Sequence, residues 1–194
     1  MRKIYLAAVL AGAGLTAAFA TPAQAASTAV AYTVADQYGD VIVYKAATGK
    51  ANRVVVASGP PYYISIDDKF PIRAGKGCKA VKGDRTRVLC GAGELTERVQ
   101  VSTFDRGDSI VNKTRLRLIA YGGTGNDTIR GSSSGDVIHG GSGADTAYGN
   151  GGPDALHGEA GNDALYGGAG NDRLFGGPGK DKLRGGPGKN HVVG

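Results

Sequence analysis

The sequence lacks the residues from which an ordinary globular core is built. Its 194 residues include no tryptophan, one methionine and four phenylalanines, whereas 34 are glycine. The middle of the chain shows no helical period, which argues against a helical protein. The length suits one ordinary domain or two small stacked units. Something other than a large aromatic core must therefore supply much of the stability.

Positive charge is also missing where a nucleic-acid-binding protein would need it. The net charge is +6, but residues 26–121 hold 15 Lys and Arg against 9 Asp and Glu, whereas residues 122–194 hold 6 against 8. No basic stripe is joined to aromatic platforms or to a known reading module. Nucleic acid is therefore not a predicted partner.

Long apolar runs are scarce, and the longest lies at the amino terminus. Two basic residues precede the uncharged run Ile4–Ala20, and small residues follow at Ala23 and Ala25. A single membrane anchor is the competing interpretation, but the run is at the short limit for a span and a cleavage site comes after it. We predict a signal peptide over residues 1–25, cleaved before Ala26. The mature protein is then extracellular, with no membrane attachment.

Cysteine occurs only twice, at Cys78 and Cys90. An even number of cysteines in an exported chain predicts a disulfide. A two-cysteine metal site would need further ligands at a matching spacing, and no nearby histidine offers one. The disulfide is therefore the predicted state.

Residues 26–121 predict an irregular β segment. Asp67, Asp68, Asp105 and Asp108 are expected to be turn residues with solvated carboxylates. Because no linker separates this segment from the glycine-rich region that begins at Gly122, we prefer a coarse β-solenoid continuing into that region. A small separate β-sandwich is the alternative. Short runs of β-prone residues predict strands over Val41–Lys45, Arg53–Ala57, Tyr62–Ile66, Arg87–Cys90, Arg98–Ser102 and Leu116–Tyr121.

From Gly122 to Gly194 a nine-residue phrase is repeated eight times without insertion or deletion. Each copy begins with glycine, has a carboxylate at its sixth place and an apolar residue at its eighth. The last copy alone has an amide at its sixth place. The sixth places are Asp127, Asp136, Asp145, Asp154, Asp163, Asp172, Asp181 and Asn190, and the eighth places are Ile129, Ile138, Ala147, Leu156, Leu165, Leu174, Leu183 and Val192.

The first six places of a copy are turn-like, and the last three suit only a very short strand. Glycine at places one, two and four permits positive φ and exposes carbonyl oxygens. Two copies make one coil with a strand on each side, so each copy stacks on the copy 18 residues later. The apolar ladder is thin. One medium side chain contributes about 1.5–3 kcal/mol, against an ordering cost of about 1–2 kcal/mol for every residue fixed.

Stacking also places the sixth-place side chains in two columns. We name them by the copies they come from. The odd column is Asp127, Asp145, Asp163 and Asp181, and the even column is Asp136, Asp154, Asp172 and Asn190. Neighbouring carboxylates about 5 Å apart repel by about 3 kcal/mol. A hard divalent cation between coils reverses the sign of that interaction. Ca²⁺ accepts carboxylate and backbone carbonyl oxygens at flexible geometry, whereas Mg²⁺ demands a tighter octahedron. Calcium is therefore the predicted ligand.

The phrases Gly122–Arg130 and Gly167–Phe175 resemble the RTX, or haemolysin-type, calcium-binding nonapeptide. The resemblance covers about 73 residues, and the rest of the chain is loosely similar to the amino-terminal part of small secreted calcium-binding proteins. It implies an all-β fold. Residues 122–194 would form a parallel β-roll stacked on the less regular segment, with each calcium between copies two apart.

Carried over place by place, the resemblance gives the metal ligands. The best sites are expected between neighbours of the odd column. In the even column, copy two has Ser132 and Ser134 in place of glycine, and Asn190 replaces the last carboxylate, so these sites are expected to be weaker. The predicted ligands are the carboxylates of Asp127, Asp136, Asp145, Asp154, Asp163, Asp172 and Asp181, with the backbone carbonyls of Gly122, Gly140, Gly158, Gly167 and Gly176.

Other interpretations are weaker. Ser133 lies in a Gly-x-Ser-x-Gly pattern, but that pattern falls in the repeat register rather than on a strand-turn-helix elbow. His139 and His157 offer two zinc ligands and no third. No catalytic residue is predicted, and the protein is expected not to be an enzyme. The alternative function is binding of, or action on, an extracellular polysaccharide through residues 27–121 or through Tyr148 and Tyr166.

Overall fold

The computed structural model describes residues 28–36, 39–92 and 96–194, so the predicted signal peptide lies outside the described residues. The described residues form two nine-stranded sheets and no helix. They therefore contain no helix that could span a membrane. The first sheet contains β5 (Ile72–Ala74), β1 (Ala29–Asp36), β2 (Gly39–Lys45), β8 (Thr96–Ser102), β10 (Arg117–Thr124), β12 (Val137–Ser142), β14 (Ala155–Ala160), β16 (Arg173–Phe175) and β18 (His191–Val193).

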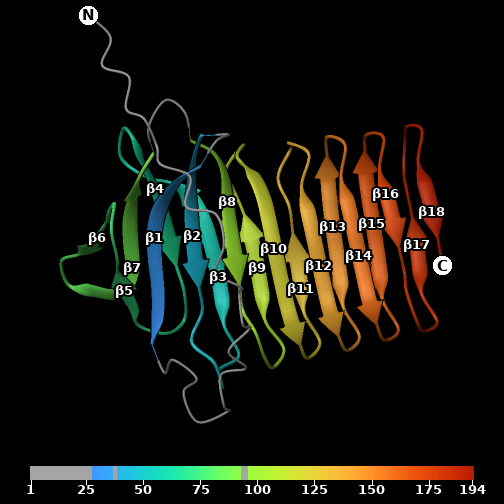
Figure 1. The fold of residues 1–194 in the computed structure, drawn as a ribbon, viewed down its shortest axis with the longest axis horizontal. Helices are drawn as coiled ribbons and strands as arrows, with labels where there is room; N and C mark the ends of the chain where they lie inside the picture. The colour runs from blue at the N-terminus through green and yellow to red at the C-terminus, as the bar shows by residue number, and fades with distance from the viewer. Residues whose placement is uncertain (1–27, 37–38, 93–95) are drawn as a thin grey trace, which may run out of the picture.

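The second sheet lies opposite the first, as Figure 1 shows. In the repeat region the chain crosses between the sheets at every turn, so from β8 onwards the even-numbered strands lie in the first sheet and the odd-numbered strands in the second. The second sheet contains β6 (Cys78–Val81), β7 (Asp84–Gly91), β4 (Tyr63–Asp67), β3 (Arg53–Ser58), β9 (Ser109–Asn112), β11 (Thr128–Arg130), β13 (Thr146–Gly151), β15 (Ala164–Ala169) and β17 (Lys182–Arg184).

The register in the repeat region is the predicted one. Ile138 pairs with Leu156 and Ala147 pairs with Leu165, in parallel and 18 residues apart. The eighth-place residues are buried from Ile129 to Leu174, with Leu156 and Leu165 at 0% exposure. The fold class, an all-β parallel roll with an apolar ladder in each sheet, is confirmed.

The strands are longer than the predicted three residues in the middle of the stack. Strands β12 to β15 each run for six residues, through the first three places of the next copy. Strand pairing continues there because backbone groups at these places face their equivalents one coil away. Gly141 pairs with Glu159, for example. The turn is thus confined to places four to six, where the carboxylate lies.

The amino-terminal segment continues both sheets. Strand β2 pairs in parallel with β8, and β3 pairs in parallel with β9, so the solenoid begins before the repeats. Beyond them, β1 is antiparallel to β2, and β4, β6 and β7 form antiparallel pairs as in a sandwich. One buried cluster runs from Ala29 to Leu174. All six strands predicted in this segment are present, whereas β1, β5, β6 and β9 were not predicted.

The Cys78–Cys90 disulfide is present and joins β6 to β7. The two cysteines are directly opposite each other in this antiparallel pair, and Cys90 is fully buried. The bond therefore joins β6, at the end of the second sheet, covalently to the adjacent strand β7.

Candidate metal centre

Seven of the eight copies share one turn conformation. Their second and fourth places have positive φ, including Asn150 and Glu159, which are not glycine. Copy two is the exception, since neither Ser132 nor Ser134 has positive φ. The second-place residues in this conformation are Gly123, Gly141, Asn150, Glu159, Gly168, Gly177 and Gly186, and the fourth-place residues are Gly125, Gly143, Gly152, Gly161, Gly170, Gly179 and Gly188.

Glycine occurs at place one for a different reason, because there is no room for a side chain at that position. A Cβ on Gly140 would lie 2.5 Å from Asp145 Oδ2, and one on Gly158 would lie 2.7 Å from the Gly176 carbonyl oxygen. These contacts are too close for any side chain. The first-place glycine therefore leaves open a position bordered by its own copy's carboxylate and by a carbonyl of the next coil.

The predicted carbonyls of Gly140, Gly167 and Gly176 border such positions. The carbonyls of Gly149 and Gly185 do so too and were not predicted. Both are first-place residues of even-numbered copies, as is the predicted Gly167. Their position at place one of a copy would have been enough to predict their carbonyls as candidate ligands. The Gly122 carbonyl instead accepts a hydrogen bond from the Thr103 hydroxyl at 2.9 Å.

The sixth-place carboxylates form continuous hydrogen-bonded columns. In each, the Oδ1 atom accepts a hydrogen bond from the backbone N–H of the sixth-place residue one coil earlier, at 2.7–3.0 Å. Thus Asp145 Oδ1 accepts from Asp127, and Asp163 Oδ1 accepts from Asp145. The side chains from Asp127 to Asp172 are only 1–2% exposed. One oxygen of each carboxylate is therefore satisfied by the protein backbone.

The other oxygen, Oδ2, is buried and has no hydrogen-bond partner in Asp127, Asp145, Asp154, Asp163 and Asp172. A buried charged oxygen without a partner is costly. Among the described residues no three His, Cys, Asp or Glu side chains converge on one point. A cation here would therefore take carboxylates from successive coils together with backbone carbonyls. That set consists only of hard oxygen ligands, the set that Ca²⁺ prefers.

The pKa values of the column carboxylates are raised, as expected for buried acids that have no positive charge beside them. Burial raises the pKa of Asp154 to about 7, with a further increase from Asp136 and Asp172. Burial likewise raises the pKa of Asp145 to about 6, and Asp127 and Asp163 add to it. Burial therefore disfavours the charged form of these carboxylates when no cation is near.

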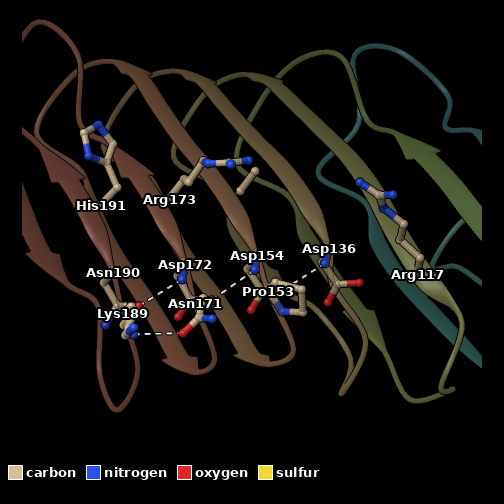
Figure 2. Close-up of a pocket in the computed structure, with 11 residues that line it drawn as sticks. Arg117, Asp136, Pro153, Asp154, Asn171, Asp172, Arg173, Lys189, Asn190 and His191 are labelled. Atoms are coloured by element: carbon tan, nitrogen blue, oxygen red, sulfur yellow. Dashed lines mark hydrogen bonds between the residues drawn. The ribbon is translucent and has the colours of Figure 1, made fainter.

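Copy two differs in a way that its sequence explains. Because Ser132 is not in the left-handed region, its backbone N–H points to Asp136 and donates to Oδ2 at 2.6 Å. Both oxygens of Asp136 are thus hydrogen-bonded, since Oδ1 accepts from the Leu118 N–H. Figure 2 shows this carboxylate in line with Asp154 and Asp172 along the even edge. Asp136 therefore lacks the unpartnered Oδ2 that Asp154 and Asp172 have.

The even column ends in an amide that needs no cation. Asn190 Oδ1 accepts from the Asp172 N–H at 2.9 Å, and its Nδ2 donates to the Gly186 carbonyl at 2.8 Å. Asn190 thus continues the hydrogen-bonded column while supplying no charge. Figure 2 shows it beside Lys189, whose backbone N–H donates to Asn171.

A family model described as the RTX calcium-binding nonapeptide repeat (4 copies) matches residues 121–156, 148–183 and 157–192. Residues 121–192 are RTX repeats. RTX repeats bind Ca²⁺ and are structural rather than catalytic elements, so the unpartnered carboxylate oxygens lie in a calcium-binding architecture. Neither a curated protein nor a solved structure matches the chain.

Two expectations for carboxylates outside the RTX repeats are wrong. Asp68 is 3% exposed rather than solvated, and it accepts hydrogen bonds from the Tyr44 hydroxyl at 2.5 Å and the Arg53 N–H at 2.8 Å. Asp108 is 4% exposed. Asp67 and Asp105 are only partly buried, and Asp67 pairs with Arg87. Strand pairing far along the sequence buries Asp68 and Asp108, which no local pattern reveals.

The outer faces of the RTX coils carry ring ladders. His139 stacks between Tyr121 and His157, with centroid separations of 5.1 and 4.7 Å, and its Nδ1 lies 2.9 Å from Glu159. On the other sheet Tyr148 and Tyr166 stack at 5.0 Å. Each ladder follows the strand spacing and covers its sheet.

Proposed function

We propose that this protein is a secreted, non-enzymatic calcium-binding protein whose RTX repeats fold when they bind Ca²⁺. The observation that carries the proposal is the run of buried carboxylates whose Oδ2 atoms have no partner. We assign three strong sites to the odd column, between Asp127 and Asp145, Asp145 and Asp163, and Asp163 and Asp181. Up to two weaker sites lie in the even column, between Asp136 and Asp154 and between Asp154 and Asp172.

Secretion is supported by the signal-like residues 1–25 and by the disulfide, which suits an oxidising compartment. A chain with so many repelling carboxylates would stay unfolded at low calcium during export. It would fold on reaching extracellular calcium, with site affinities of about 10⁻⁴–10⁻³ M.

Calcium removal is expected to abolish most of the repeat structure at neutral pH. We expect a calcium titration of the chain from Ala26 to produce β-sheet circular dichroism, and EDTA to reverse it. Magnesium at the same concentration serves as the control, because its octahedral preference suits these oxygens poorly. A β signal that is indifferent to both calcium and EDTA contradicts coupled folding. The absence of bound calcium in equilibrium dialysis contradicts calcium binding itself.

The second candidate is binding of an extracellular polysaccharide by residues 27–121 or by Tyr148 and Tyr166. The two rings are parallel to within 9°, and the Arg130 guanidinium lies 4.0 Å from the Tyr148 centroid. The ring faces therefore contact each other and a cation, which leaves ring edges and hydroxyls for a glycan. Glycan-array binding that is lost in both Tyr148→Ala and Tyr166→Ala, and retained in His157→Ala, would support this candidate. Absence of glycan binding by the unmodified chain would reject it.

A further inference from the structure

Residues 103–111 repeat the RTX turn without its sequence. The stretch reads Thr103-Phe104-Asp105-Arg106-Gly107-Asp108-Ser109-Ile110-Val111, with no glycine at places one, two or four. It begins 19 residues before Gly122 rather than 18, and it precedes the residues matched by the family model. Nevertheless Phe104 and Arg106 have φ of +73° and +69°, the left-handed conformation of places two and four.

The hydrogen bonds of this stretch are those of a repeat. The Asp108 N–H donates to Asp127 Oδ1 at 2.7 Å, as the Asp127 N–H donates to Asp145 Oδ1. The Thr128 N–H donates to the Asp108 carbonyl at 2.9 Å, as the Thr146 N–H donates to that of Asp127. Asp108 therefore extends the odd column by one coil towards the amino terminus.

The backbone carbonyls follow the same arrangement. The Phe104 and Arg106 carbonyl oxygens lie against Gly123 and Gly125, where any Cβ would collide with them. In the next coil the Gly123 and Gly125 carbonyls lie in the same way against Gly141 and Gly143. The oxygen framework of a repeat is thus built here from residues other than glycine.

Asp108 also has the unsatisfied oxygen of a repeat carboxylate. Its side chain is 4% exposed, and its Oδ1 accepts from the Asn52 N–H at 2.5 Å and from Asn52 Nδ2 at 3.2 Å. Its Oδ2 has no hydrogen-bond partner, and the same is true of Asp127 Oδ2. Thr103 takes place one, and its hydroxyl donates to the Gly122 carbonyl at 2.9 Å and also lies beside the Asp108 carboxylate. A neutral oxygen therefore lies where the other copies have glycine.

We infer a further calcium site between Asp108 and Asp127, with the Thr103 hydroxyl oxygen as an additional ligand. It rests on the proposed function, because it uses the same chemistry as the repeats. Two residues with side chains are held in a conformation that costs each of them free energy, and such strain concentrates where a ligand is held. Asn52, an amide, ends the odd column on the far side of this site, as Asn190 ends the even column.

Asp108→Asn is expected to lower the calcium content of the chain from Ala26 by one ion. Asparagine retains the oxygen that accepts from Asn52 and removes the charge. The measurement is equilibrium dialysis at saturating calcium followed by atomic absorption. Asp105→Asn is the matched control. Asp105 lies in the same turn, but its carboxylate accepts from the Gly49 N–H at 2.7 Å instead of facing Asp127. This control is expected to bind as many ions as the unmodified chain.

The outcomes separate this site from the proposed function. Equal calcium content in Asp108→Asn and the unmodified chain overturns the inference and leaves the repeat sites intact. No calcium in the unmodified chain overturns the proposed function and this site with it. Should Asp108→Asn fail to give the native circular dichroism in calcium, Thr103→Val tests the same site. It retains the carboxylate, and it is expected to weaken the affinity of one site without changing the count at saturation. Unchanged affinities in Thr103→Val would then overturn the inference.

Discussion

In EDTA, the free energy of unfolding is expected to fall as the pH is raised from about 4 to about 7. The folded-state pKa is about 7 for Asp108 and Asp154 and about 6 for Asp145, because burial disfavours their charged forms. The ordinary value for Asp is about 3.9. Between these values the folded chain binds more protons than the unfolded chain, so stability decreases as the pH rises through this window. The loss is complete once the pH is well above the folded-state pKa of about 7 of Asp108 and Asp154.

In saturating calcium the free energy of unfolding is expected to rise, rather than fall, as the pH is raised over the same window. The cation binds deprotonated carboxylates, so acidification releases it and lowers stability. Urea unfolding at several pH values, with EDTA or with calcium, measures both slopes. Asp154→Asn is expected to flatten both, because it removes one titrating group while retaining an oxygen for the Asp136 N–H. Stability in EDTA that increases between pH 5 and pH 7 would contradict the burial of uncompensated carboxylates.

Gly158→Ala is expected to destabilise the folded chain by about 1–3 kcal/mol and to remove one strong calcium site. The new methyl group would lie 2.7 Å from the Gly176 carbonyl and still closer to Asp163 Oδ2, so the carboxylate must move. Denaturant unfolding in calcium measures the stability, and equilibrium dialysis counts the ions.

Gly151→Ala is the matched control. Gly151 occupies place three of copy four, is not in the left-handed region, and a Cβ there would find its nearest atoms 3.8 Å away. This substitution is expected to stabilise the chain by about 0.4–1 kcal/mol, by restricting the unfolded state. If the two substitutions change the free energy of unfolding equally, crowding at place one does not explain the effect of Gly158→Ala.

The repeat region could be predicted from the sequence because several places of the nine-residue phrase recur with the same period. An apolar residue at every place eight fixes the buried ladder, and an almost invariant place six fixes the carboxylate columns. Two exceptions show what the pattern does not require. Asn150 and Glu159 adopt the left-handed conformation at place two without being glycine. Stacking in the coil holds these two residues in that conformation. Ser132 does not adopt it, and its N–H donates a hydrogen bond to the Asp136 carboxylate instead.

The burial of Asp68 and Asp108 in the amino-terminal segment could not be predicted, because their partners lie far along the chain. Asp108 joins the odd column through Asn52, which is 56 residues away, and through Asp127 at an interval that breaks the period. A search for a fixed spacing discards such a residue. Tyr44 similarly reaches Asp68 from a strand 24 residues earlier. Local propensity carries no information about these pairs.

The ring ladders on the outer faces carry information that the interior lacks. Inside, Asp and aliphatic places recur every nine residues, so a slip by one whole copy would match carboxylate to carboxylate and leucine to leucine. Outside, Tyr121, His139, His157 and Phe175 belong to one sheet, and Arg130, Tyr148 and Tyr166 to the other. A one-copy slip would set residues of the two ladders against each other and would separate Tyr148 from Tyr166. The outer rings therefore favour the 18-residue register, which the nine-residue period of the core does not distinguish from a slip by one copy.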